Sequence, residues 1–123
     1  DDVDLINGHL TATGNDSKEI ANWAKALKRS GQNFPQVQST KSLIGHCLSA
    51  AGSIESVAVV LQLHKRFSHA SINCSDLSSK ISQIINKELI SSHNLNNNIN
   101  IIVKSGFGFG DVNSVVVWKR FEE

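Results

Sequence analysis

The sequence predicts an α/β fold in which a mixed β-sheet packs on a buried central helix. Two stretches with apolar residues at helical spacing alternate with short β-like runs, and the chain closes with two runs rich in Val and Ile. With 123 residues, 40% of them apolar, the chain can bury one modest core. We therefore expect a single domain over residues 1–123.

Two short β-like runs flank the first predicted helix. The first covers residues 4–7 and ends at a glycine, and His9 follows at the start of a Thr-rich loop. The second covers residues 35–40. Between them, Asp16 and Glu19 precede apolar residues at helical spacing, which is an N-cap signal. The pattern predicts a helix over residues 17–29, with basic residues in its last turn and a glycine, Gly31, as its stop.

The longest apolar helical pattern runs from about Cys47 to the basic pair at residues 65–66. Its spacing predicts a helix buried on most of its surface, the central helix of the fold. It follows residues 39–52, a stretch of small side chains that carries Lys41 and His46. Small residues let a ligand approach the backbone, so we expect a functional site here.

The C-terminal half contains the clearest β signal. Residues 68–73 predict a short strand, residues 81–90 a weak helix, and the Asn-rich residues 94–98 an exposed loop. Residues 100–104 and 114–118 predict a hairpin with a wide, glycine-rich connection. The glycines and two phenylalanines of that connection fit either a flexible turn or a backbone that passes close to a ligand.

Composition excludes several classes of function. The net charge is +1 and the basic residues are scattered, so the sequence shows no clustered basic face of the kind that binds nucleic acid or an anionic membrane. No apolar run approaches the roughly 20 residues of a membrane span, and the acidic start does not resemble a signal peptide, so we expect a cytoplasmic protein. Cys47 and Cys74 are expected to be reduced. The histidines lack metal-ligand spacing, so no metal is expected, and His64, His69 and His93 are expected on the surface.

Four motifs, in order, carry a family resemblance. They are HLTAT (residues 9–13), STKSLIGHCLSAAGSIE (39–55), SIN (71–73) and SGFGFGDVN (105–113). They resemble HGTST, STKxxxGHxxGAAGxxE, PxIN and NSFGFGGTN of the β-ketoacyl-[acyl carrier protein] synthases, condensing enzymes of the thiolase superfamily. The resemblance covers nearly the whole chain and implies part of the C-terminal half of the thiolase-like fold.

The resemblance also implies roles for particular residues. His9 and His46 match the two histidines that polarise the malonyl thioester carbonyl and support its decarboxylation. Lys41 matches the family's active-site lysine, and Glu55 matches the glutamate that pairs with it. Phe109 corresponds to the gating phenylalanine, whose backbone N–H helps to form the oxyanion hole.

Substrate delivery is implied in the same way. Thr11 and Thr13 match the threonines that bind the phosphopantetheine arm of acyl carrier protein, so no resident cofactor is expected. The family's nucleophilic cysteine lies in an N-terminal half that this chain lacks. We therefore expect an incomplete synthase domain, inactive alone, with the missing half and acyl carrier protein as partners and a homodimer at full length.

The chain departs from the family pattern in three ways. Leu10 replaces a glycine and the loop at Gly14 is one residue shorter. Asp111 and Val112 stand where the family has a glycine and a threonine, and the nucleophilic cysteine is absent.

Two rival functions are weighed against the synthase. One rival is a non-catalytic partner subunit of the chain-length-determining kind, although such a subunit has no chemical need for both histidines. The other is a carrier-protein-binding module without chemistry.

Overall fold

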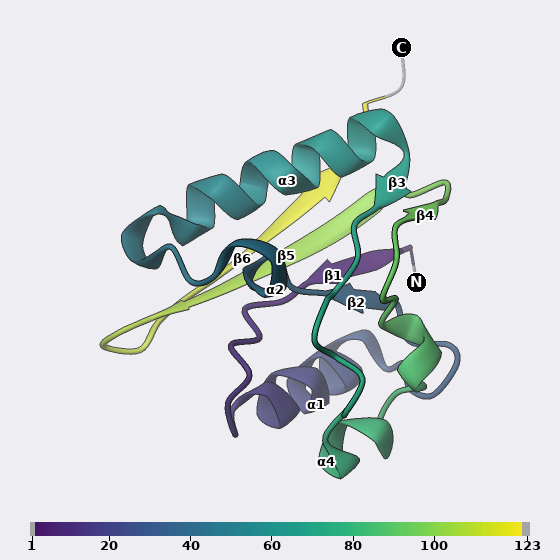
Figure 1. Cartoon of the computed structure of the whole chain (residues 1–123), viewed down its shortest axis with the longest axis vertical. Coiled ribbons are helices and arrows are strands. Elements are labelled where there is room, and N and C mark those ends of the chain that lie inside the picture. The colour runs from purple at the N-terminus through teal and green to yellow at the C-terminus, as the bar shows by residue number, and fades with distance from the viewer. Residues whose placement is uncertain (1, 122–123) are drawn as a thin grey trace.

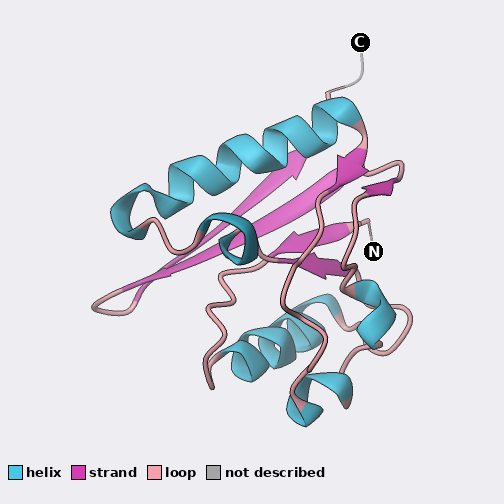
Figure 2. Cartoon of the chain, in the orientation of Figure 1, coloured by secondary structure: helices cyan, strands magenta, loops and turns pink. Residues whose placement is uncertain are grey.

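The computed structural model describes residues 2–121, which form three layers (Figures 1 and 2). Helix α3 (Ala51–Lys65) covers one face of a sheet, and α1 (Asp16–Leu27) with the short α4 (Ser79–Ser82) covers the other. The sheet contains β1 (Leu5–Asn7), β2 (Gln36–Gln38), β5 (Ile101–Gly108) and β6 (Val112–Lys119). Smaller elements are α2 (Lys41–Ile44), β3 (Phe67–Ser68), β4 (Leu95–Asn96) and 3-10 turns at Leu48–Ala50 and Lys87–Leu89.

The sheet is mixed, as predicted. Its strand order is β2-β1-β5-β6, in which β1 pairs in parallel with both β2 and β5 while β5 and β6 form an antiparallel hairpin. Because the carboxyl ends of parallel strands meet at one edge, the loops that follow β1 and β2 lie together. This edge carries the predicted site.

Alternation along the strands divides the core between the two faces. Ile6 pairs with Val37 and Val103 in one row, which packs with α1 and α4. Leu5 and Ile102 form the preceding row, which packs on α3. Successive strand residues point to opposite faces, so one short strand, β1, supplies both cores.

A polar row follows on the face that packs on α3. Asn7 is paired in register with Gln38 on β2 and with Lys104 on β5, and all three side chains are buried. Gln38 donates to Gln62 of α3 at 2.8 Å, and Lys104 contacts Glu55 of the same helix. The apolar core therefore gives way to polar contacts where the strands approach the site.

The helix predicted over residues 17–29 is present, but it ends earlier. It stops at Leu27, and Lys28 adopts a left-handed conformation with φ 54°. Gly31 is therefore not the stop. Beyond this end, the Arg29 guanidinium donates to the backbone carbonyls of Val3 and Asn33.

The central helix differs from its prediction in two ways. It begins at Ala51 rather than near Cys47, because Leu48 has φ 49° and opens a 3-10 turn. It is also not buried on most of its surface. Val59 and Leu63 are buried against the sheet, whereas the apolar side chains on the rest of the helix are 40–60% exposed: Ile54, Val57, Val60 and Leu61.

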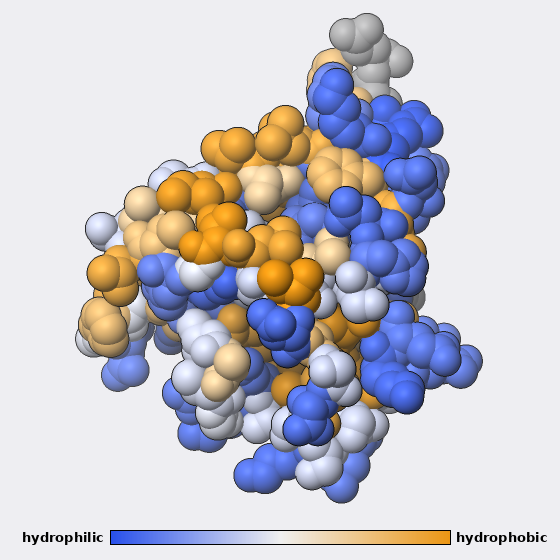
Figure 3. All heavy atoms as spheres, viewed as in Figure 1, coloured by the Kyte–Doolittle hydropathy of each residue, from blue (hydrophilic) through white to orange (hydrophobic). Residues whose placement is uncertain are grey.

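The exposed apolar surface continues beyond α3. In Figure 3 apolar side chains gather over the part of the molecule where α3 and the neighbouring hairpin lie. On β6, Val115, Val116 and Val117 are 42–64% exposed. The prediction of burial was wrong for the outer side chains of α3, because the described sheet covers only one side of this helix.

The remaining predicted elements are present in part. The strand predicted over 68–73 is limited to β3, and the helix over 81–90 is replaced by α4 and the turn at Lys87–Leu89. The hairpin connection is not wide. β5 continues through Gly108, and the reversal uses residues 109–111, where Gly110 and Asp111 have positive φ. Within residues 2–121, no helix is long and apolar enough to cross a membrane.

Candidate active site

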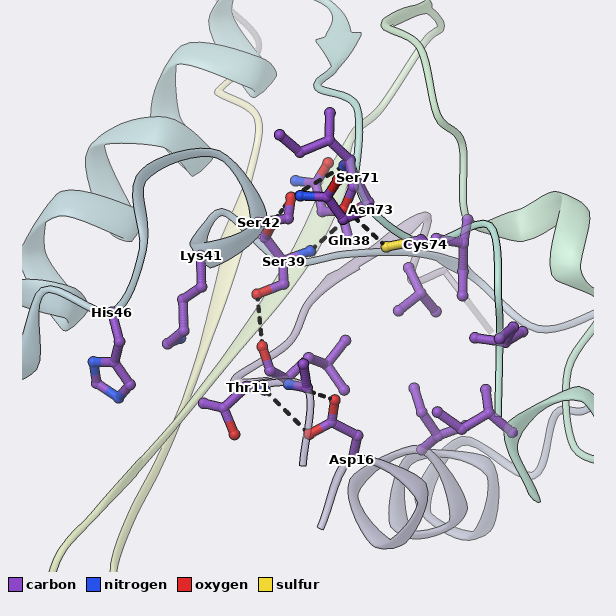
Figure 4. Close-up of a pocket in the computed structure, with 18 of the residues that line it drawn as sticks. Thr11, Asp16, Gln38, Ser39, Lys41, Ser42, His46, Ser71, Asn73 and Cys74 are labelled. Atoms are coloured by element: carbon purple, nitrogen blue, oxygen red, sulfur yellow. Dashed lines mark hydrogen bonds between the residues drawn. The ribbon is translucent and has the colours of Figure 1, made fainter. Parts of the chain in front are cut away.

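A cavity of about 410 Å³ lies where the loops after β1 and β2 meet (Figure 4). Its polar wall includes Thr11, Lys41 and His46. Its apolar wall includes Ile20 of α1 and Ile81 of α4. Three of the predicted site residues therefore line one cavity, opposite its apolar wall.

His9 and His46, which are far apart in the sequence, lie side by side. Their ring centroids are 5.3 Å apart, with an angle of 79° between the planes. The Phe107 amide donates to Nδ1 of His9 at 3.3 Å, and the Leu48 amide donates to Nδ1 of His46 at 3.0 Å. Because Nδ1 accepts in both rings, the proton of each neutral imidazole is on Nε2. The pair therefore offers two N–H donors.

The environment of His9 favours its neutral form. Burial lowers the pKa of His9 below its ordinary value of 6.5, and the charge of Lys41 lowers it further. Glu19 and Glu55 act in the opposite direction but do not reverse the shift. At pH 7 the ring can donate a hydrogen bond without placing a permanent charge in the site.

Glu19 holds the backbone on which His9 sits. Its carboxylate accepts from the amides of His9 and Leu10, at 2.9 and 3.0 Å, and from the Ser105 hydroxyl at 2.6 Å. The side chain is buried, so these donors satisfy it. The sequence pattern assigned Glu19 to a helix cap and missed this role, since nothing in the spacing reveals contacts to Ser105 on β5.

Asp16 organises the threonine loop in the same manner. Its carboxylate accepts from the amides of Thr11, Ala12 and Thr13 at 3.0–3.4 Å. The hydroxyls of Thr11 and Thr13 are 3.2 Å apart, and Thr11 lines the cavity. Asp16 is the first residue of α1 and Asn15 is its N-cap, so the predicted N-cap signal does not describe the contacts that Asp16 makes.

A buried ion cluster supports the other side of the site. Glu55 of α3 contacts Lys41 at 2.5 Å through one carboxylate oxygen and Lys104 at 3.0 Å through the other. All three side chains are no more than 6% exposed. The pairing of Lys41 with Glu55 is present as expected, and Lys104 is an addition that no sequence motif indicated.

The structure separates Phe109 from this group. Phe109 is at the tip of the hairpin and 97% exposed, whereas the ring of Phe107 lies 5.3 Å from that of His9. Asp111 also lies in the tip, with φ 60°, a conformation that Asp tolerates better than branched residues. Leu10 covers Gly8, where an added Cβ would lie 2.7 Å from the Leu10 side chain.

Two predictions outside the site also have outcomes. Cys47 and Cys74 are free, as expected. His69 is not a surface residue: it is partly buried, accepts from the Thr40 hydroxyl at 3.1 Å and donates to the Ala70 carbonyl at 2.8 Å. Burial lowers the pKa of His69, and its role is structural.

Comparison with solved structures defines the fold. The ishigamide ketosynthase/chain length factor matches with a TM-score of 0.87 at 20% identity, covering 98% of this chain and 28% of the other. The chain adopts part of the thiolase-like ketosynthase fold. A second structure is described as a type II PKS acyl-carrier protein in complex with its ketosynthase bound to the hexaketide. It matches with a TM-score of 0.79 at 26% identity, over 98% of this chain and 29% of that one.

Comparison of sequences defines the family. Residues 1–75 match the family described as "Beta-ketoacyl synthase, C-terminal domain". The chain belongs to this family. It is 32% identical over 123 residues to the chloroplastic 3-oxoacyl-[acyl-carrier-protein] synthase I of Arabidopsis thaliana, covering 99% of this chain. The chain spans about 25% of the length of that relative.

Proposed function

We propose that the chain is the C-terminal part of a 3-oxoacyl-[acyl carrier protein] synthase of fatty acid or polyketide-like biosynthesis. The reaction is decarboxylative Claisen condensation of malonyl-carrier protein with an enzyme-bound acyl chain. The paired rings of His9 and His46, with Nδ1 of each held by a backbone amide, carry this proposal.

The geometry fits the charge that develops in such a reaction. Loss of CO₂ from a malonyl thioester leaves an enolate, whose oxygen needs hydrogen-bond donors as its charge grows. Two Nε2–H groups would supply them. His46 is exposed among the described residues, so these bonds become stronger than in water once the rest of the synthase covers the pair. The enolate carbon then attacks the acyl thioester, and the thiolate of the enzyme's cysteine leaves. That cysteine belongs to the N-terminal half of the synthase.

Other residues hold or guide the substrate in this proposal. Lys41, fixed by Glu55, starts the short α2 that leads to His46 and so sets the position of that ring. Thr11 and Thr13 bind the phosphopantetheine arm, and no resident cofactor takes part. Phe109 contributes a backbone N–H to the oxyanion hole and a gating side chain once the rest of the synthase packs around the hairpin tip.

The exposed apolar surface supports the proposal that the chain is one part of a larger domain. The outer side chains of α3 and β6, including Val57 and Val117, form a surface that an N-terminal half would cover. Acyl carrier protein is the proposed second partner, as in the solved ketosynthase complex. A homodimer is the proposed state of the full-length synthase.

The test is malonyl decarboxylation by the full-length synthase that contains this chain. We expect His9→Ala and His46→Ala each to lower the rate by roughly 10²–10³-fold, the effect of removing one oxyanion donor. His93→Ala, a substitution at an exposed histidine, is the matched control and leaves the rate unchanged. Retained activity in both site variants contradicts the proposal. Carrier-protein binding by a wild type that lacks decarboxylase activity indicates a binding module or a non-catalytic subunit.

A further inference from the structure

His69 is a partly buried histidine whose hydrogen bonds lead towards the site. Its Nδ1 lies 2.8 Å from the Ala70 carbonyl oxygen, and its Nε2 lies 3.1 Å from the Thr40 hydroxyl. A carbonyl oxygen can only accept, so the proton of the neutral ring is on Nδ1 and the bare Nε2 accepts from the hydroxyl. Burial lowers the pKa of His69, which favours the neutral ring that this arrangement requires. His69 therefore has the opposite tautomer to His9 and His46.

The hydroxyl of Thr40 joins His69 to the end of β1. Thr40 is buried, and its hydroxyl also accepts from the side-chain amide of Asn7 at 2.9 Å. Asn7 is the last residue of β1 and lies two positions before His9. The hydroxyl thus accepts one hydrogen bond and donates one. A continuous chain of hydrogen bonds runs from β1 to the segment that follows β3.

Thr40 also begins the path to His46. It is the N-cap of α2, and its backbone carbonyl accepts from the amides of the last two residues of that helix at 3.0 and 3.3 Å. Its hydroxyl makes no capping bond among the described residues, although capping is a common use of threonine at this position. Lys41 follows directly, and His46 follows α2. Because its hydroxyl is bonded to His69 and to β1, Thr40 fixes where α2 starts.

Further contacts hold His69 in place. Its amide donates to Gln62 Oε1 of α3 at 2.9 Å, and Gln38 of β2 donates to the same oxygen at 2.8 Å. The chain beyond β3 runs beside the residues between β2 and α2 (Figure 1), where the Ser39 amide donates to the Ser71 hydroxyl at 3.3 Å. The ring is therefore a fixed acceptor rather than a mobile one.

A hydroxyl that is bonded to a histidine could also be a nucleophile with its base. The structure does not support that role. Thr40 is only 5% exposed, and neither Thr40 nor His69 is among the described residues that line the cavity. The bond between them therefore acts on the position of the backbone and not on a substrate.

We infer that His69 is a positioning residue for the proposed condensing site: by accepting from Thr40, it holds the ends of β1 and β2 so that the paired histidines of the site meet. This inference rests on the proposed function. It adds a residue from outside the four family motifs. A displacement of about 1 Å at a reacting centre lowers a rate by about 100-fold, so a hydrogen bond remote from the substrate can control turnover.

The test compares His69→Leu with His69→Gln in the full-length synthase that contains this chain. Leucine has no acceptor, whereas the carbonyl oxygen of glutamine can accept from Thr40. We expect His69→Leu to lower kcat for malonyl decarboxylation by roughly 10- to 100-fold, with the KM for malonyl-carrier protein unchanged. His69→Gln restores most of the kcat. His93→Leu, at an exposed histidine, is the matched control and behaves like wild type.

A second measurement does not depend on turnover. Nitrogen-15 NMR reports the environment of the imidazole nitrogens of His9 and His46. We expect their shifts to change in His69→Leu and to return towards the wild-type values in His69→Gln. If His69→Leu does not fold, Thr40→Val takes its place in both measurements, because it removes the donor of the same hydrogen bond.

Each contrary outcome has a separate meaning. A wild-type kcat in His69→Leu overturns the inference. An equal loss in His69→Leu and His69→Gln also overturns it, because that pattern indicates a general effect on packing rather than a lost acceptor. A wild-type synthase that does not decarboxylate malonyl refutes the proposed function instead. The ring shifts then decide the inference alone, and unchanged shifts in His69→Leu overturn it.

Discussion

Replacement of Glu19 by glutamine tests how the fold positions His9. The carboxylate of Glu19 accepts from the His9 and Leu10 amides and from the Ser105 hydroxyl. Glutamine has only one oxygen that can accept hydrogen bonds. Its NH₂ group takes the place of the second carboxylate oxygen and cannot accept from the donor there. At least one buried donor loses its partner, which costs about 1–3 kcal/mol.

This loss of free energy makes local opening of the backbone at His9 and Leu10 more frequent, and amide hydrogen exchange measures that opening. At about 1.4 kcal/mol per factor of ten, we expect the His9 and Leu10 amides to exchange with solvent roughly 5- to 150-fold faster in Glu19→Gln. Hydrogen exchange read by NMR or mass spectrometry measures this directly. Glu88→Gln, at an exposed glutamate, is the control. Unchanged exchange at both His9 and Leu10 in Glu19→Gln would refute the argument that this carboxylate holds the histidine backbone.

Three further predictions concern stability. Glu55→Gln leaves two buried ammoniums without their carboxylate, so chemical denaturation should show a loss of about 3–5 kcal/mol, and a loss below about 1 kcal/mol contradicts the ion cluster. Because the folded pKa values of His9 and His69 are lowered from 6.5, the unfolded state binds more protons below that pH, and the melting temperature should fall as pH decreases from 6.5 and stay constant above it. Asp111→Val places a branched residue at φ 60° and should lower stability by about 1–2 kcal/mol, whereas Asp111→Gly should not.

The order of elements was predictable because it depends on local patterns. The β-like run before His9, the helix after Asp16 and the closing hairpin were all found close to their predicted places. Their ends were not, since long-range contacts set them. The helix ends at Leu27 with Lys28 as its C-cap, and the neighbouring Arg29 side chain reaches Val3, a contact that no local pattern encodes.

The site was predictable only where a motif spans it. The motifs indicated His9, His46 and the pair of Lys41 with Glu55, and the structure brings these residues together. Residues that hold them from elsewhere in the chain were missed. Lys104 meets Glu55 across the interface between the sheet and α3, and a single sequence contains no local signal for such a meeting.

The exposure of α3 has a different origin. Its apolar side chains are spread around the helix, a pattern typical of burial on all sides. Val57 and Leu61 nevertheless face outward, because the described residues supply only one covering layer. The pattern agrees with the proposal that the chain is one part of a larger domain.

The central claim is that His9 and His46 present two neutral Nε2–H donors to one site. Nitrogen-15 NMR of the imidazoles in the full-length synthase at pH 7 tests it most directly, because the two ring nitrogens have separate shifts that report which one is protonated. We predict protonated Nε2 and unprotonated Nδ1 in both rings, as their backbone donors require. Protonation of Nδ1 in either ring at pH 7, as a second tautomer or as imidazolium, would contradict the account.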